Sequence, residues 1–337
     1  MGGDSALCYE DDVHAPESGD MPQETRTMTT GFYTHADCTL HEMGADHPEC
    51  PQRLAAIEDR LIAAQIAPWL ERHDDAPPAS LEDVERAHSA LYVADLKKRG
   101  DFEQGHEWID ADTMMNPHTW QAALRAAGAA ISATDAVIDG HLHNAFCSIR
   151  PPGHHATRDQ AMGFCFLGNV AIAARHALDV RGLDRVAIVD FDVHHGNGTE
   201  DIFRGDERVL MVSFFQHPFY PYSGAEGEQP NMVNVPVPAY TKGDGVRHIV
   251  TEQWLPRLRT FAPQMLFISA GFDAHREDDM GQMGLVEADY AWITRQLVDF
   301  AEAQCEGRIV SCLEGGYNLS ALGRSVAEHV RVLAGLD

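Results

Sequence analysis

The stretch Arg185-Val-Ala-Ile-Val-Asp190-Phe-Asp192-Val-His194-His195-Gly196 decides the fold. Its first half is a continuous apolar run of strand length, which is typical of a strand covered on both faces by helices. Its second half supplies carboxylates and imidazoles where that strand should end. Because ligands of such folds sit at the carboxyl ends of parallel strands, the stretch predicts a buried strand that leads into a functional site.

Other segments of the chain repeat the two patterns. Further apolar runs of strand length are Ala145–Ile149, Val209–Phe214, Met265–Ala270 and Ile309–Leu313. Helical periodicity occupies roughly 54–66, 119–139, 169–180, 245–261, 287–304 and 320–334. In the first of these helices, one face carries Leu54, Ile57, Leu61, Ile62 and Ile66. Alternation of strands and helices predicts an α/β fold around a mainly parallel sheet.

The 337 residues, of which 44% are hydrophobic, suffice for one large domain or two small ones. From Thr30 onward the apolar segments continue without a long linker or an internal repeat, so we predict one domain over 30–337. Residues 1–29 are polar and acidic and show no periodicity, which predicts a disordered leader. The sequence has no apolar run of 18 residues and no secretion signal at its start, so we expect a cytoplasmic protein.

The chain carries 25 Lys+Arg against 52 Asp+Glu, a net charge of -27. Such a surface repels nucleic acid and anionic membranes and favours a cationic or neutral substrate. The seven cysteines are scattered and contain no C-x-x-C pair. A disulfide framework or a cysteine-bound zinc is therefore not expected.

Three polar residues alternate at the end of the decisive stretch: Asp190, Asp192 and His194. An extended backbone would point all three to one side, where burial without a cation would be costly. Asp273, which follows another strand and a glycine, is the natural third ligand beside Asp192 and His194. Mixed oxygen and nitrogen ligands suit Zn²⁺, and Fe²⁺ or Co²⁺ also fit. The alternatives are a solvated strand end and, for Asp273, a helix N-cap.

Two more strand ends offer reactive groups. His154 and His155 follow the stiff segment Pro151-Pro-Gly153 and could move protons at neutral pH. Tyr317 follows two glycines and could place a phenol beside a developing oxyanion. Surface histidines in a loop are the alternative for the pair.

Together these motifs resemble the histone deacetylase family, most closely its class II branch and bacterial relatives that include the acetylpolyamine amidohydrolases. The motifs are Arg150-Pro-Pro-Gly-His-His-Ala156, Asp190-Phe-Asp-Val-His-His-Gly-Asn-Gly-Thr199, Gly271-Phe-Asp-Ala274 with Asp278 and Gly281, and Leu313-Glu-Gly-Gly-Tyr-Asn318. The resemblance runs from about Gly31 to the C-terminus. It implies the arginase-deacetylase fold, a parallel eight-stranded sheet flanked by helices.

The resemblance also implies roles. The metal ligands would be Asp192, His194 and Asp273, and His154 and His155 would be the proton-transfer pair. Tyr317 would polarise the substrate carbonyl. His154 would donate a hydrogen bond to Asp190, and Asn197 would lie behind His155. Because a neutral amide does not raise an imidazole pKa as a carboxylate does, His155 should be the more readily neutral histidine and the better candidate base.

A structural potassium ion is implied as well. Its ligands would be Asp190, the backbone of Asp192 and His194, Ser213, and the backbone of Phe214.

For the substrate, the resemblance implies an aromatic slot made by Phe164 with Phe219 or Tyr220, although either ring could simply belong to the core. The full expected set is Gly163, Phe164, Phe219, Tyr220, Met280 and Gly315. An apolar Met280 fits an acyl-lysine chain better than a second amine. Arg53 resembles an arginine that lines an interior channel, and a structural salt bridge is the alternative. We read His195, His217 and His275 as supporting or surface residues.

The implied reaction is hydrolysis of an acetyl amide to acetate and a free amine, most readily on N-acetyl-lysine in proteins or peptides. Acetylpolyamines and other small acetylated amines are the alternative substrates, and a homo-oligomer is compatible with either. A non-catalytic module that binds an acylated partner and an arginase-like hydrolase with two metal ions stay open as different classes.

Overall fold

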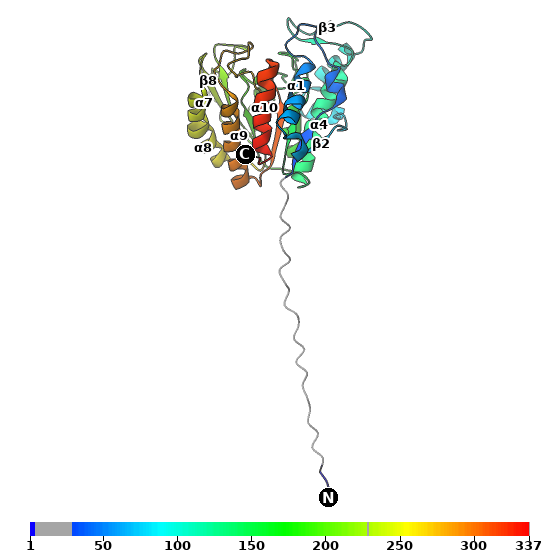
Figure 1. The fold of residues 1–337 in the computed structure, drawn as a ribbon. Coiled ribbons are helices and arrows are strands. Elements are labelled where there is room, and N and C mark those ends of the chain that lie inside the picture. Colours follow the sequence, from blue (N-terminus) through cyan, green and yellow to red (C-terminus); the bar gives the residue numbers. More distant parts are fainter. Residues whose placement is uncertain (4–28, 228, 337) are drawn as a thin grey trace.

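An eight-stranded sheet, in which every neighbouring pair of strands is parallel, forms the centre of the computed structural model (Figure 1). The structure describes residues 1–3, 29–227 and 229–336. The strand order is β2-β1-β5-β10-β9-β6-β7-β8. The strands are β1 (Thr30–Tyr33), β2 (Leu70–His73), β5 (Asn144–Cys147), β6 (Val186–Asp190), β7 (Val209–Gln216), β8 (Met232–Val237), β9 (Leu266–Ala270) and β10 (Ile309–Leu313). This sheet confirms the single-domain, eight-stranded parallel fold that the resemblance implies.

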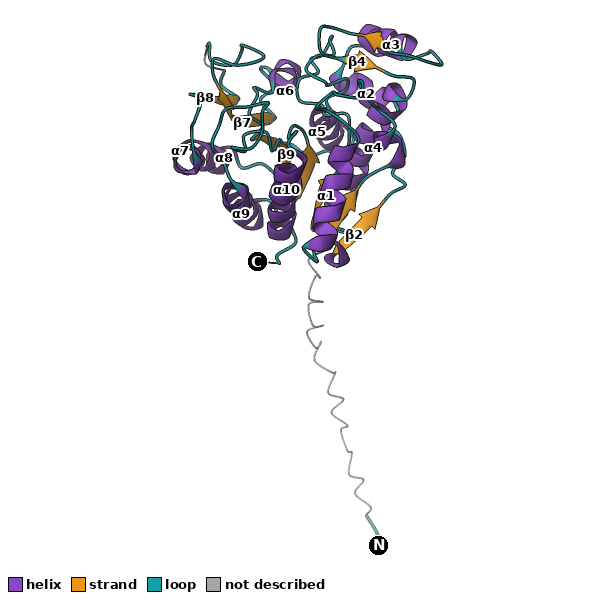
Figure 2. Ribbon diagram, turned by 45° about the horizontal axis from the view of Figure 1, so that its top comes forward, coloured by secondary structure: helices purple, strands orange, loops and turns teal. Residues whose placement is uncertain are grey.

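Helices cover both faces of the sheet (Figure 2). They are α1 (Gln52–Ala63), α2 (Leu81–Ala87), α3 (Ala90–Arg99), α4 (Thr119–Ile138), α5 (Asn169–Asp179), α6 (Asn197–Phe203), α7 (Gly243–Ile249), α8 (Leu255–Phe261), α9 (Glu287–Gln304) and α10 (Leu319–Leu333). A π-helical segment, Val250–Trp254, joins α7 to α8, and short 3-10 turns occupy Ala36–Thr39 and Ala67–Trp69. A separate antiparallel pair, β3 (Glu107–Trp108) and β4 (Met114–Met115), lies beside α3. Helices α1, α10 and α9 lie side by side over one face, and α4 packs against α5 over the other.

The five strands predicted from apolar runs are all present, with ends within two residues of those expected. Strands β1, β2 and β8 of the large sheet, and the short pair β3 and β4, were not predicted. Strands β2 and β8 are the two edges of the sheet, so they carry exposed polar residues or a proline instead of an apolar run. One helix prediction is wrong: Ile62 is 59% exposed, whereas Leu61 beside it is buried. Helix α1 turns about 100° per residue, so Ile62, one position after the buried Leu61, points toward solvent.

The strand order brings the predicted motifs together. Strands β5, β10, β9 and β6 are consecutive in the sheet, and each one ends within three residues of the start of a motif. Because parallel strands all end at the same edge, the four loops that follow them meet at one place.

The predicted leader falls mostly on residues 4–28, which lie outside the described residues, so this prediction stays open. In the part of the chain that the structure describes, none of the helices has the length and apolar character needed to cross a membrane.

Candidate active site

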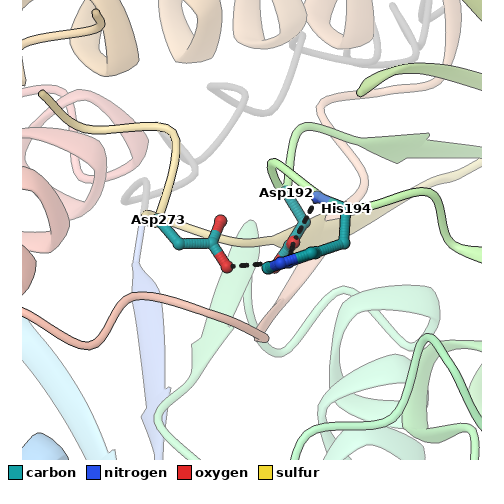
Figure 3. Close-up of side chains that lie close together, drawn as sticks. All are labelled: Asp192, His194 and Asp273. Carbon is teal, nitrogen blue, oxygen red and sulfur yellow. Dashed lines mark hydrogen bonds and ion pairs between the residues drawn. The ribbon is translucent and has the colours of Figure 1, made fainter. Parts of the chain in front are cut away.

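The three expected metal ligands converge at the carboxyl edge of the sheet (Figure 3). Strand β6 ends at Asp190, so Asp192 and His194 project from the loop that follows, and Asp273 projects from the loop after β9. Nδ1 of His194 lies 3.0 Å from Oδ1 of Asp192 and 3.3 Å from Oδ2 of Asp273. One ligand atom from each residue lies within 4.8 Å of the other two, and all three residues are buried. The spacing suits a single ion.

Backbone N–H groups fix the two carboxylates. Val193 donates to Oδ1 of Asp273 at 2.9 Å, and Gly315 donates to Oδ2 of Asp192 at 2.9 Å. Oδ2 of Asp273 is buried and accepts no hydrogen bond from the described residues. A buried carboxylate oxygen without a donor is costly, so its position beside His194 marks the place where a cation would bind.

Gly315, which was expected to contact substrate, lies against the two ligand carboxylates. A Cβ atom at this position would stand 1.9 Å from Oδ2 of Asp273 and 2.6 Å from Oδ2 of Asp192. Only glycine lets the backbone approach the two carboxylates so closely.

The charges of the three groups fit a divalent metal. Burial and the neighbouring Asp192 raise the pKa of Asp273 to about 7. Burial alone would lower the pKa of His194, but the carboxylates of Asp192 and Asp273, 3.0 and 3.3 Å from its Nδ1, outweigh that effect and raise it to about 10. Without an ion, the cluster therefore retains protons that a metal would displace. Three protein ligands would leave coordination positions open for water and substrate.

The two histidines after β5 lie side by side, with ring centroids 4.0 Å apart. Nδ1 of His154 is 3.0 Å from Oδ2 of Asp190, and Nδ1 of His155 is 2.7 Å from Oδ1 of Asn197. Burial opposes charging of His154, but the carboxylates of Asp192 and Asp190 outweigh it and hold its pKa well above the ordinary value. Burial and the charge of His154 hold the pKa of His155 well below its ordinary value. The raised pKa of His154 and the lowered pKa of His155 agree with the expectation that His155 is the more readily neutral of the two histidines.

The residues expected around potassium lie on β6, its following loop and β7. Asp190 and Ser213 are direct neighbours in the β6–β7 register, and Phe214 follows on β7. The N–H of Asp192 donates to Oδ1 of Asp190 at 3.1 Å, and the Ser213 hydroxyl donates to Oδ1 of Asn234 at 3.1 Å. Potassium binding stays a prediction.

A pocket of about 220 Å³ leads to this centre. Its lining residues are Asp112, His155, Gly163, Phe164, His194, Phe219, Tyr220, Asp279, Met280 and Tyr317. The rings of Phe164 and Tyr317 meet edge to face at 5.9 Å, and Phe219 stacks on His194 at 5.4 Å. The pocket thus contains every expected substrate residue except Gly315, and its narrow aromatic walls suit an extended alkyl chain.

Three acidic residues of the site received no role from the sequence. Asp112 and Asp279 line the pocket. Asp278 is buried; its Oδ2 accepts the N–H of Tyr317 at 2.6 Å, and its Oδ1 accepts the N–H of Met280 at 3.0 Å. The resemblance had identified Asp278 as a motif position, but its hydrogen bond with the backbone of Tyr317, 39 positions away, could not be read from the sequence.

Arg53 is fully buried and forms an ion pair with Glu49 at 3.0 Å. It donates to the backbone oxygens of Glu314 and Gly316, and its guanidinium lies 4.9 Å from the centroid of the Tyr317 ring. The contacts of Arg53 in the structure therefore support a structural salt bridge.

Three other histidines, His195, His217 and His275, do not line the pocket.

Fold and site together define an α/β protein with a candidate metal centre beneath a pocket with aromatic walls. The chain belongs to the histone deacetylase family, because the family model described as "Histone deacetylase domain" matches residues 47–333.

Named relatives agree with this family. The chain is 39% identical to a probable deacetylase of Archaeoglobus fulgidus over 322 residues, which cover 92% of this chain and 88% of the relative. It is 38% identical to the histone deacetylase-like amidohydrolase of Pseudomonas aeruginosa over 316 residues, covering 87% and 82% of the two chains. Its structure is similar to the crystal structure of the HDA15 HD domain, with a TM-score of 0.86, 33% identity and coverage of 92% and 89%.

Proposed function

We propose that this chain is a zinc-dependent deacetylase that hydrolyses an acetyl amide to acetate and a free amine, with N-acetyl-lysine in peptides or proteins as its preferred substrate. The observation that carries the proposal is the buried group of Asp192, His194 and Asp273 beneath a 220 Å³ aromatic pocket. A mixed oxygen and nitrogen ligand set supports Zn²⁺, although Fe²⁺ or Co²⁺ would also fit.

Asp192, His194 and Asp273 would hold the ion. When bound, it would supply Lewis-acid polarisation of the amide carbonyl and lower the pKa of a water molecule. The aromatic pocket would exclude bulk water and hold the acyl-lysine chain along the walls formed by Phe164 and Phe219.

The histidines would move the protons. Because Nδ1 of His155 faces the oxygen of Asn197, it carries a hydrogen in the neutral ring, which leaves Nε2 free to accept the proton of the attacking water. His154, whose Nδ1 lies 3.0 Å from Oδ2 of Asp190, would be the protonated member of the pair and would give a proton from Nε2 to the leaving amine. The Tyr317 hydroxyl would donate to the oxyanion that develops on the substrate carbonyl.

Small acetylated amines are the second candidate substrates, because the carboxylates of Asp112 and Asp279 line the pocket and would attract a second amine. Met280, an apolar side chain among the same lining residues, favours an acyl-lysine chain instead.

The discriminating experiment compares kcat/KM of the zinc-loaded protein on an acetyl-lysine peptide and on acetylputrescine, since this ratio measures differential transition-state binding. We expect the peptide to be the better substrate, and the variant Met280→Glu to shift the ratio toward acetylputrescine. If kcat/KM of the wild type is higher on acetylputrescine than on the peptide, small acetylated amines replace N-acetyl-lysine as the proposed substrate. Absence of turnover on both, with the metal site shown to be full, would contradict the proposed function.

Two further parts of the proposal are a structural potassium ion around Asp190 and Ser213 and a cytoplasmic location. The six described cysteines are free, which supports a reducing compartment.

A further inference from the structure

Glu314 is a fully buried carboxylate that lies between the loops of the active site without lining the pocket. Its Oε2 accepts the N–H of Gly153 at 2.7 Å and the N–H of His154 at 3.1 Å. Its Oε1 accepts the hydroxyl of Ser269 at 3.1 Å. Among the described residues, no basic side chain forms an ion pair with it.

A buried carboxylate without a cationic partner is unfavourable. Burial raises the pKa of Glu314 to about 7, even though the nearby charge of His154 and the two backbone N–H groups lower it. A leucine of similar size would fill the space without this cost. The hydrogen bonds that the carboxylate accepts from the backbone of the histidine loop offset this cost.

Glu314 also belongs to the loop that carries the oxyanion donor. It stands three residues before Tyr317 and directly before Gly315, whose N–H holds Asp192. Its backbone oxygen accepts a hydrogen bond from Arg53, which fixes the backbone of Glu314. One residue thus connects the loop after β5, which bears the proton carriers, with the loop after β10.

We propose that Glu314 is a positioning residue: by binding the N–H groups of Gly153 and His154, it fixes the histidine pair relative to Tyr317 and Asp192. This inference rests on the proposed function for its kinetic consequence, but its structural part can be tested without any turnover. Glu314 touches neither the pocket nor the metal ligands with its carboxylate oxygens, so it acts through His154 and not on the substrate.

The kinetic test compares three substitutions in the full chain loaded with zinc. Gln in Glu314→Gln offers an oxygen to both N–H groups and an amide that can donate to Ser269, so we expect kcat within about threefold of wild type. Leu in Glu314→Leu offers no acceptor, and we expect kcat to fall about 100-fold with KM nearly unchanged, because misplacement by about 1 Å costs on that order. Glu314→Asp, which is one methylene shorter, should fall between them and replaces the leucine variant if the latter does not fold.

Glu85→Leu, the same change at an exposed position of α2, is the matched control and should leave kcat unchanged. An equal loss in Glu314→Gln and Glu314→Leu would show that the charge and not the hydrogen bonding matters, and would overturn the inference. So would full activity of Glu314→Leu.

The second readout is the amide proton resonance of Gly153 and His154 in protein labelled with ¹⁵N at glycine and histidine. Both protons should be shifted downfield in wild type and Glu314→Gln and return upfield in Glu314→Leu or Glu314→Asp. Unchanged resonances would contradict the positioning role. If the wild type turns over no acetyl amide while these shifts appear as expected, the proposed function fails and the positioning role stands.

Discussion

Replacing Tyr317 with phenylalanine removes one hydroxyl from the candidate site and little else. The backbone N–H of Tyr317 is held by Asp278, and its ring packs against Phe164 and beneath Arg53, all of which a phenylalanine retains. Its hydroxyl makes no hydrogen bond to the described part of the chain. Burial holds the Tyr317 pKa well above its ordinary value, so the group is a protonated donor at neutral pH.

Loss of one donor to an oxyanion costs about 100-fold to 1,000-fold in kcat, or about 3–4 kcal/mol of transition-state stabilisation. We therefore expect Tyr317→Phe to lose kcat by this factor with KM little changed. Because no buried partner is left without a hydrogen bond, the free energy of unfolding should stay within about 0.5 kcal/mol of wild type.

Steady-state kinetics on an acetyl-lysine peptide provides the assay, with zinc content and thermal unfolding measured on the same preparations. A kcat within about threefold of wild type would refute the role of the hydroxyl, as would a loss of activity fully explained by lost zinc. A protein that only binds an acylated partner would be indifferent to the substitution.

Three other substitutions test the surroundings of the site. Gly315→Ala brings a methyl group within 1.9 Å of Oδ2 of Asp273, so zinc affinity measured by chelator competition should fall about 10- to 100-fold; an unchanged affinity would contradict the packing argument. Glu49→Gln leaves two buried arginines without their carboxylate and should lower the free energy of unfolding in urea by about 3–5 kcal/mol, whereas a loss below about 1 kcal/mol would show that the ion pairs are dispensable. Burial lowers the pKa of His329 to about 3 from 6.5, so between these values the unfolded chain binds a proton that the folded chain lacks, and stability falls as the pH falls. By pH 5 the wild type should have lost about 2 kcal/mol of its free energy of unfolding through this proton, and His329→Gln should not show this loss. A difference in stability between wild type and His329→Gln that is constant from pH 7 to pH 5 would disprove the linkage.

The sequence predicted the fold class because the central strands are buried on both faces and are therefore continuously apolar. Asp192 and His194 were recognisable as a pair because they alternate at the end of such a strand. Asp273 was a candidate because it follows another strand and a glycine, but its meeting with Asp192 and His194 depends on β9 lying next to β6, which no local pattern contains.

The remainder of the site depends on contacts between residues far apart in the chain. Asp278 and Glu314 appeared as motif letters, but their function as acceptors for the backbone of Tyr317 and His154 is set by how the loops meet. The resemblance placed Gly315 among the substrate residues, whereas its closeness to the ligand carboxylates is a property of the tertiary structure that the sequence does not show. The edge strands β2 and β8 were missed because solvent on one side removes the apolar pattern.

We propose that one metal ion, held by Asp192, His194 and Asp273, is required for amide hydrolysis. Protein stripped by a chelator is titrated with Zn²⁺, and turnover of an acetyl-lysine peptide is plotted against zinc bound per chain, as measured by mass spectrometry. Activity should rise linearly from zero and reach its plateau at one equivalent, and Asp273→Ala should bind no zinc at this site. Turnover by the metal-free protein, or a plateau only at two equivalents, would contradict the claim.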